Sequence, residues 1–469
     1  MDPQFQRADP LAHGSLGRRA FIRGAGAAVL VGIGGGLVAC AKTTTASTTA
    51  NKSTSTVKQT VNLAVAVPHA PTASAIAAVV AAFQKAHPEI QLSVPQSPSS
   101  TSKLITAVEA GQAPDVALTT TPNVFTLWDA NAVLDLSHYL AQSSIAKDFP
   151  STILNGTKLP TGQLPGIASK AATDGLYYNV DAFTSAHLAL PTPEWTQDNF
   201  RSAALSLTST SRNVYGTGGD PWKFSLENAV GWGSEWVPTA NPVTLNYNNQ
   251  IVQGETFIQA LRYLDKSWMP GSIMNWSTSF PTGQMATIRQ NSYSLLTYGI
   301  AIGSSFKWST TTIPLGPARR AVQVSLFPWM ITSKSKNPDA AWTYIEWCLS
   351  SPDYWNIVIP AQGTIPPVLS QLSLWESLMG QNAILKGVDL SSWTLPIKEN
   401  TICVQPVFKY KNSTAWNWWG NAVGNCMTGS PPKGDMDVAT QFQAAATATD
   451  AYEAQQAKLA ASGSSSTSA

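Results

Sequence analysis

Residues 61–94 read VNLAVAVPHAPTASAIAAVVAAFQKAHPEIQLSV, and residues 115–119 read DVALT. Residues 61–67 alternate β-branched with small or polar side chains, which is typical of a strand, and Pro68 and Pro71 end this strand. Four apolar residues then recur at helical spacing: Ile76, Val79, Val80 and Phe83. The segment therefore begins with a strand followed by a helix.

The pattern repeats once more before residue 119. Residues 90–94 predict a second strand, an apolar stripe over residues 104–108 predicts a helix that ends at Gly111, and residues 115–119 predict a third strand. A β-α-β-α-β order with right-handed crossovers produces a parallel sheet, whose ligands bind beyond the carboxyl ends of its strands. The loops at Pro68–Pro71 and Thr119–Pro122 are candidate cleft loops, or ordinary surface loops.

Composition excludes several classes of protein. The chain has 469 residues, enough for two lobes, and 43% are apolar, which excludes global disorder. Only 12% are charged and the net charge is +2, so nothing in the sequence attracts nucleic acid. The turn after the first strand lacks the glycines of a phosphate-binding loop, which disfavours dinucleotides. The 17 tryptophans are either core residues or a stacking surface for flat, partly apolar ligands such as sugars.

The amino end carries the features of an export signal. Arg18 and Arg19 precede an uncharged run over residues 24–39, which is too short for a permanent membrane span, and the arginine pair resembles a twin-arginine signal. Leu37–Cys40 resembles a bacterial lipobox, in which Cys40 is lipidated. We therefore expect a signal peptide over 1–39, a Ser/Thr-rich tether over 40–59, and a membrane-anchored chain facing outside the cytoplasm.

Three cysteines remain in the mature chain. Cys403 and Cys426 can form a disulfide in an oxidising exterior, although spacing alone does not establish the geometry. Cys348 lies on an apolar stripe and is expected to be a buried free thiol.

Six segments, in order, resemble the extracellular solute-binding proteins of ABC importers, in particular the sugar-binding family 1. They are the first strand and residues 83–90, 111–116, 175–181, 280–286 and 335–342. The resemblance implies an α/β fold of two lobes, each a sheet flanked by helices, joined by several hinge crossings. It implies no cofactor, no metal and no catalysis, and it implies an ABC permease as partner.

The resemblance also implies a division of the chain. Lobe 1 comprises 60–171 plus 322–350, lobe 2 comprises 172–321 plus 351–455, and residues 456–469 form a disordered tail. The crossings are expected near Lys170–Asp174, Pro317–Val322 and Ser350.

Sugar sites combine aromatic platforms with polar side chains that pair with hydroxyl groups. The platforms expected here, each with core packing as the alternative, are Trp232, Trp236, Trp329, Tyr293, Trp276 and Trp308. The polar contacts expected are Thr120, Thr121, Asp174, Asn291 and Thr364.

Enzyme functions have little support in the sequence. It contains no nucleophile elbow, zinc-protease motif, C-x-x-C or phosphate-binding P-loop, and its five histidines are isolated. A glycosidase would need two carboxylates across a cleft, for which Asp174 and Glu235 are the candidates. We predict a monomeric lipoprotein that captures a neutral sugar or oligosaccharide for import. The alternatives are a glycosidase, a binder of a peptide or polyol, and a structural or adhesive surface lipoprotein.

Overall fold

The computed structural model describes residues 59–65, 73–94, 100–237, 244–404, 412–428 and 437–462. All of these residues belong to one compact unit, residues 56–469. The predicted signal peptide, Cys40 and nearly all of the predicted tether lie outside the described residues, as does the loop Pro68–Pro71.

The β-α-β-α-β prediction is confirmed. Strand β1 (Gln59–Val65) is parallel to both β2 (Ile90–Ser93) and β3 (Val116–Leu118), and helices α1 (Ala73–Ala86) and α2 (Thr101–Glu109) make the two crossovers. Buried Leu104 and Val108 form the inner stripe of α2, as the periodicity indicated. The carboxyl ends of β1 and β3 therefore meet at one edge of the sheet.

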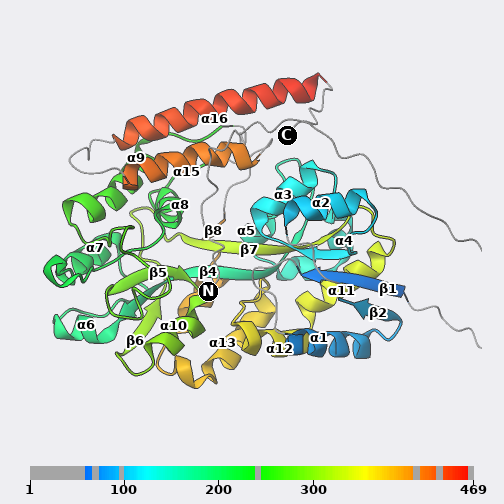
Figure 1. Cartoon of the computed structure of the whole chain (residues 1–469), viewed down its shortest axis with the longest axis horizontal. Coiled ribbons are helices and arrows are strands. Elements are labelled where there is room, and N and C mark those ends of the chain that lie inside the picture. The colour runs from blue at the N-terminus through cyan, green and yellow to red at the C-terminus, as the bar shows by residue number, and fades with distance from the viewer. Residues whose placement is uncertain are drawn as a thin grey trace, which may run out of the picture. The chain divides into compact units, whose positions relative to one another are not determined.

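Two long strands continue the sheet from this parallel part. The strand order is β2-β1-β3-β7-β4-β5, in which β7 (Val322–Ile331) is antiparallel to both β3 and β4 (Ile167–Asn179). The first part of β4 pairs with β7, whereas from Asp174 onward β4 pairs with β5 (Thr287–Asn291) and β6 (Trp308–Thr311). In Figure 1, β4 and β7 run side by side, with β1–β3 at one end and β5 and β6 at the other.

Every residue of β4 is buried, so both faces of this strand are covered. Its register with β7 is interrupted between Ala168 and Ala171, which places Ser169 and Lys170 in an irregular segment. Irregularities of this kind bend a strand and redirect its side chains. The crossing expected near Lys170–Asp174 falls within β4, between this irregular segment and the change of pairing partner.

The remaining elements have these bounds: α3 (Thr121–Asp129), α4 (Ser137–Gln142), α5 (Ser151–Asn155), α6 (Val180–Ser185), α7 (Gln197–Ser206), α8 (Pro221–Gly231), α9 (Asn249–Gln259), α10 (Ser294–Ile302), α11 (Pro338–Ser350), α12 (Pro352–Gln362), α13 (Leu372–Gly380), α14 (Ser391–Lys398), β8 (Ile402–Cys403), α15 (Asn412–Thr428) and α16 (Val438–Ala461). None of the described helices is both long and apolar enough to cross a membrane.

The largest hydrophobic cluster joins α1, α11 and α12 to the sheet. Helix α12 contacts both α1 and α11, so the segment predicted to return to lobe 2 at residue 351 begins with a helix that packs on two helices predicted to belong to lobe 1. At the other end of the chain, α16 continues to Ala461. The disordered tail expected from residue 456 is therefore helical over its first six residues, because the apolar spacing that would mark this part of the helix is weak among its alanines and glutamines.

Helix α15 contacts elements from both ends of the long strands. It packs on α8, α9 and α16, and it also contacts α3, which follows β3. A second hydrophobic cluster, formed largely by α8, α15 and α16, lies beneath these contacts.

Candidate functional site

A buried charged pair lies at the point where β4 changes its partner. The side chain of Asp174 is 0% exposed, and its Oδ1 lies 3.0 Å from Nζ of Lys223. The same ammonium donates to Oε1 of Gln290 at 3.3 Å. Oδ2 of Asp174 has no hydrogen-bond partner among the described residues. A buried carboxylate oxygen without a partner is costly, and it is also a ready acceptor for a ligand hydroxyl.

Local sequence explains this geometry. Asp174 is opposite Asn291 in the β4–β5 register, and Gln290 is the next residue along β5. Lys223 lies in the first turn of α8, where Asp220 caps the helix by accepting from the N–H of Trp222 at 3.0 Å. Burial raises the pKa of Asp174, and the charge and hydrogen bond of Lys223 oppose this shift.

A second buried pair fixes α8 to the strands. Arg289 Nη1 lies 3.1 Å from Oε2 of Glu227, and neither side chain is more than 1% exposed. The guanidinium also donates to Gln197 Oε1 at 2.6 Å and lies 3.8 Å from the ring centroid of Phe224. The other Glu227 oxygen accepts from the backbone N–H of Gln323 in β7 at 3.1 Å. This network holds α8 against both β5 and β7, and thereby positions Lys223.

An aromatic cluster lies beside the irregular segment of β4, nearer the start of the strand than Asp174. Nζ of Lys170 lies 5.1 Å from the ring centroid of Phe327 and 5.8 Å from that of Tyr293, and the two rings meet edge to face at 5.7 Å. Burial lowers the pKa of Lys170 to about 7. Burial raises the pKa of the Tyr293 hydroxyl, and the side chain of Thr364 opposes that shift.

The structure brings seven of the predicted site residues close to β4 and β7: Thr120, Thr121, Asp174, Asn291, Tyr293, Trp329 and Thr364. Thr121 Oγ1 donates to the backbone oxygen of Leu326 at 3.0 Å, and Thr120 precedes α3 and accepts from Asn123 at 3.0 Å. Asn291 is the last residue of β5 and Tyr293 lies two residues later, just before α10, and both are half-buried. We call the row formed by Lys170, Asp174, Asn291 and Tyr293 the β4 strip.

Four predicted platforms lie away from the β4 strip. Trp236 is 1% exposed, its ring packs on Trp419 and Phe442 at 5.2 Å each, and its Nε1 donates to a backbone oxygen of α8. This corrects the prediction for Trp236, which is a core residue because α15 and α16 close over it. Trp232 packs on Phe257 at 5.4 Å.

The last two predicted platforms lie near α10. Trp308 stacks on Tyr177 at 6.1 Å. Trp276 is 38% exposed, and its backbone oxygen accepts from Tyr298.

The three cysteines within the described part of the chain are free thiols. Cys403 and Cys426 are buried in the same hydrophobic cluster and are not bonded to one another in this structure, so the disulfide that the sequence allows is not formed here. Cys348 is the buried free thiol that its position indicated. For the glycosidase alternative, Asp174 is fully buried and ion-paired, while Glu235 lies exposed in the loop after α8. No cluster of three or more His, Cys, Asp or Glu side chains suited to a metal ion occurs among the described residues.

Sequence reasoning missed three members of this site: Lys170, Lys223 and Gln290. A lysine among the small residues that begin this strand is a signal that points to Lys170. The Asp-Pro-Trp-Lys run over residues 220–223 is a helix start that places a cation in the first turn. Gln290 carries no comparable signal.

Comparison with known proteins decides the family. Residues 67–354, more than half of the chain, match the family described as bacterial extracellular solute-binding protein. The chain belongs to this family. No curated protein matches it.

Several solved structures of solute-binding proteins share the fold of this chain at low sequence identity. The sugar-binding protein MalE from the phytopathogen Xanthomonas citri has a TM-score of 0.69 and 17% identity, covering 86% of this chain and 99% of that one. The cyclic α-maltosyl-1,6-maltose binding protein from Arthrobacter globiformis has a TM-score of 0.68 and 17% identity, covering 84% and 99%. An ABC substrate-binding protein from Listeria monocytogenes, in complex with cycloalternan, has a TM-score of 0.67 and 16% identity, covering 84% and 99%.

These matches confirm the predicted two-lobed fold of a periplasmic binding protein. They also confirm the predicted class of function, because this family consists of extracellular solute-binding proteins. Family members and structural neighbours bind solutes, and this chain is an exported solute-binding protein.

Proposed function

We propose that this chain captures a neutral sugar or oligosaccharide between its two lobes and delivers it to the permease of an ABC importer. Family membership supports solute binding, and the similar structures include proteins bound to cycloalternan, to α-D-tagatose and to mannotriose. Closure of the lobes on the ligand would make binding depend on contacts to both halves at once.

The observation that carries the proposal is the unpartnered Oδ2 of Asp174 within the β4 strip. A sugar hydroxyl would donate to this oxygen, and the half-buried Asn291 and Tyr293 beside it supply amide groups and an aromatic ring. The negative charge of Asp174 is already balanced by Lys223 at 3.0 Å, so the pair favours an uncharged solute over an ionic one. A hydroxyl in the wrong position would leave Oδ2 unpaired, which costs about 1–3 kcal/mol.

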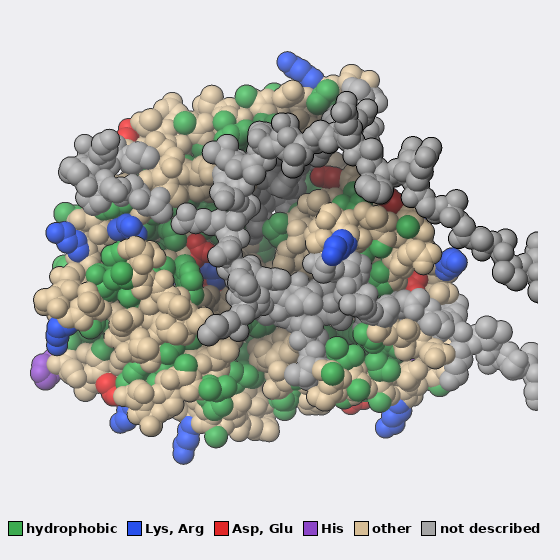
Figure 2. Space-filling view, viewed as in Figure 1, with side chains coloured by type: hydrophobic (Ala, Val, Ile, Leu, Met, Phe, Trp, Pro, Cys, Tyr) green, Lys and Arg blue, Asp and Glu red, His purple; other side chains and the backbone are tan. Residues whose placement is uncertain are grey.

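Surface charge agrees with a neutral solute. Charged side chains occur singly over the face shown in Figure 2 and form no extended patch of one sign on its described part. Long-range steering of an ionic ligand needs such a patch.

We further propose that the chain is held at the membrane by lipid on Cys40. The support is the order of the twin arginines, the uncharged run over residues 24–39 and the cysteine, followed by a tether rich in Ser and Thr. Replacement of Cys40 by Ala should move the protein from the membrane fraction into the soluble exported fraction, and persistence of the variant in the membrane fraction would remove the lipid from the proposal.

A carbohydrate panel tests solute capture. Thermal-shift screening identifies sugars that raise the melting temperature, and titration calorimetry then gives their dissociation constants. We expect Asn291→Ala to weaken the best sugar at least tenfold, because it removes two donors and an acceptor beside Asp174.

Asn249→Ala is the matched control, since Asn249 is exposed at the start of α9. Its dissociation constant should equal that of the unaltered protein. The proposal fails if no sugar binds, or if Asn291→Ala and Asn249→Ala bind sugar equally well.

A further inference from the structure

A small cavity lies beside the β4 strip, between the sheet and helices α1, α11 and α12. Its volume is about 30 Å³, and its walls are mostly apolar. The lining residues are Ile76, Val79, Val80, Leu118, Ser169, Lys170, Trp329, Tyr344, Tyr354 and Gln362.

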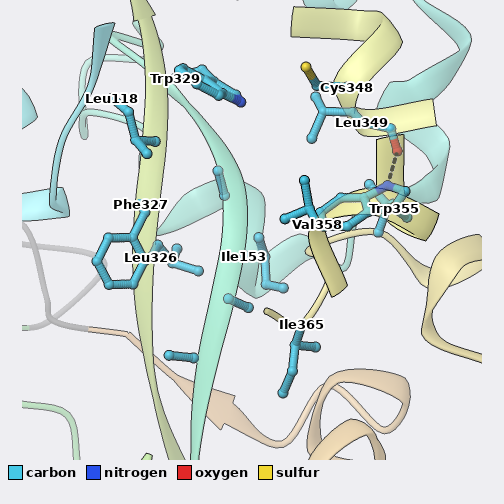
Figure 3. Packing of buried hydrophobic residues seen from close by; sticks show 14 of the residues in the cluster. Leu118, Ile153, Leu326, Phe327, Trp329, Cys348, Leu349, Trp355, Val358 and Ile365 are labelled. Carbon is cyan, nitrogen blue, oxygen red and sulfur yellow. Dashed lines mark hydrogen bonds between the residues drawn. The ribbon is translucent and has the colours of Figure 1, made fainter. Parts of the chain in front are cut away.

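One of the lining residues, Trp329, carries a buried hydrogen-bond donor without a partner in the described part of the chain. Trp329 is 3% exposed, and its Nε1 has no hydrogen-bond partner among the described residues. The ring meets that of Tyr344 edge to face at 5.8 Å, which fixes its orientation. Figure 3 shows the nitrogen end of the ring pointing away from β7, toward the space in front of α11. Trp329 thus lines the cavity with a buried ring that carries an unpartnered N–H, whereas the sequence predicted a stacking platform.

The cavity lies where the fold places ligands. Leu118 is the last residue of β3, and the carboxyl ends of the parallel strands β1 and β3 meet at this edge. Lys170 lines the cavity and also faces the rings of Phe327 and Tyr293. The cavity and the β4 strip therefore share Lys170, so a ligand in the cavity would lie at one end of the strip.

Size and chemistry restrict what can enter. A volume of about 30 Å³ is two to three times what a single water requires, so it suits a group of two to four heavy atoms. Apolar walls favour a methyl group, and the Trp329 N–H needs an acceptor. An acetyl group has three heavy atoms, of which one is a methyl carbon and one is a carbonyl oxygen.

We propose that this cavity receives the acetyl group of a 2-acetamido sugar, whose carbonyl oxygen accepts from Nε1 of Trp329 while its methyl packs against Val79, Val80 and Leu118. This inference rests on the proposed function and specifies its substrate class. The ring hydroxyls of the sugar would then lie along the β4 strip.

The experiment compares matched sugars by titration calorimetry. Glucose, galactose and mannose are each titrated against their 2-acetamido derivatives, and cellobiose is titrated against N,N′-diacetylchitobiose. We expect at least one acetylated sugar to bind ten times or more tightly than its unsubstituted partner, because a buried donor gains its acceptor.

Two variants tie that preference to the cavity. Trp329→Phe keeps a ring but removes the N–H, and should reduce the preference about tenfold. Val80→Leu adds volume to the cavity wall and should abolish the preference by steric exclusion, even if Trp329→Phe proves unstable. Trp195→Phe is the matched control, because Trp195 packs on Phe183 and does not line the cavity, and it should retain the full preference.

The outcomes separate the two proposals. If sugars bind without preference for the acetyl group, or if a preference survives both cavity variants, the cavity holds only ordered water and the inference is overturned while sugar capture stands. If no sugar of any kind binds, the proposed function itself fails.

Discussion

Removal of Lys223 should leave Asp174 buried without its cation. In Lys223→Met the carboxylate keeps its position at 0% exposure but loses an ammonium at 3.0 Å. Breaking a buried pair in this way costs about 3–5 kcal/mol. The carboxyl group can escape part of this penalty by taking up a proton, since its reference pKa is 3.8 and each pKa unit corresponds to about 1.4 kcal/mol. At pH 7 the loss is therefore limited to about 4 kcal/mol.

A double-mutant cycle measures this loss. The free energy of unfolding is obtained from urea titrations followed by tryptophan fluorescence, for the unaltered protein, Lys223→Met, Asp174→Asn and the double variant. We expect Lys223→Met to lose about 3 kcal/mol and the double variant to recover most of that loss, because a neutral amide needs no counter-ion.

The pH dependence gives an independent check. In Lys223→Met the folded pKa of Asp174 is raised above its unfolded value, so the stability is retained below about pH 4 and is lost as the pH rises. Two results would refute the argument that buried Asp174 needs Lys223 as its counter-ion. One is a loss of unfolding free energy below about 1 kcal/mol for Lys223→Met at pH 7, and the other is a double variant no more stable than Lys223→Met alone.

Three further predictions concern buried titratable groups. Burial raises the pKa of Glu255 to about 8, so the stability it contributes should be lost as the pH rises from about 4.5 to 8, and Glu255→Gln should flatten the unfolding free energy over that interval. Lys170 has its pKa lowered to about 7, so stability should rise between about pH 7 and 10.5, and Lys170→Met should abolish that rise in the same urea titrations. Cys403 and Cys426 should both react with Ellman's reagent after unfolding without reductant, whereas two fewer reactive thiols than in the reduced chain would indicate a bond between them.

Local patterns were sufficient to predict the first three strands and the two helices between them. The alternation over residues 61–67 and the spacing of Val79 and Phe83 depend only on neighbours within two to four positions, and both periods are visible in the sequence. The start of α7 also depends on near neighbours, because Thr196 forms a reciprocal cap with Asn199 three positions later. Signals of this kind can be recognised in the sequence because the residues that create them lie close together along the chain.

The candidate site depends on contacts that no local pattern reveals. Trp236 and Trp329 look alike in sequence, but α15 and α16, nearly 200 residues later, cover Trp236, whereas Trp329 reaches a cavity wall. Lys223 becomes a partner of Asp174 only because Arg289 and Glu227 hold α8 against the strands. The sequence therefore predicted which kinds of side chain the site would contain. Which individual residues reach the site depends on tertiary packing.

Strand β4 explains why the candidate features gather where they do. A strand that pairs with one partner throughout has regular backbone hydrogen bonds and regularly spaced side-chain neighbours. In contrast, β4 is irregular at Ser169 and Lys170, and its pairing partner changes from β7 to β5 at Asp174. At such points side chains lose a regular neighbour and can turn toward a ligand. The charged pair lies at the second point and the cavity at the first, four to five residues apart along one buried strand. A ligand that spans both points would therefore contact both the segment of β4 that pairs with β7 and the segment that pairs with β5. Binding should then depend on the geometry of this strand more than on any single platform.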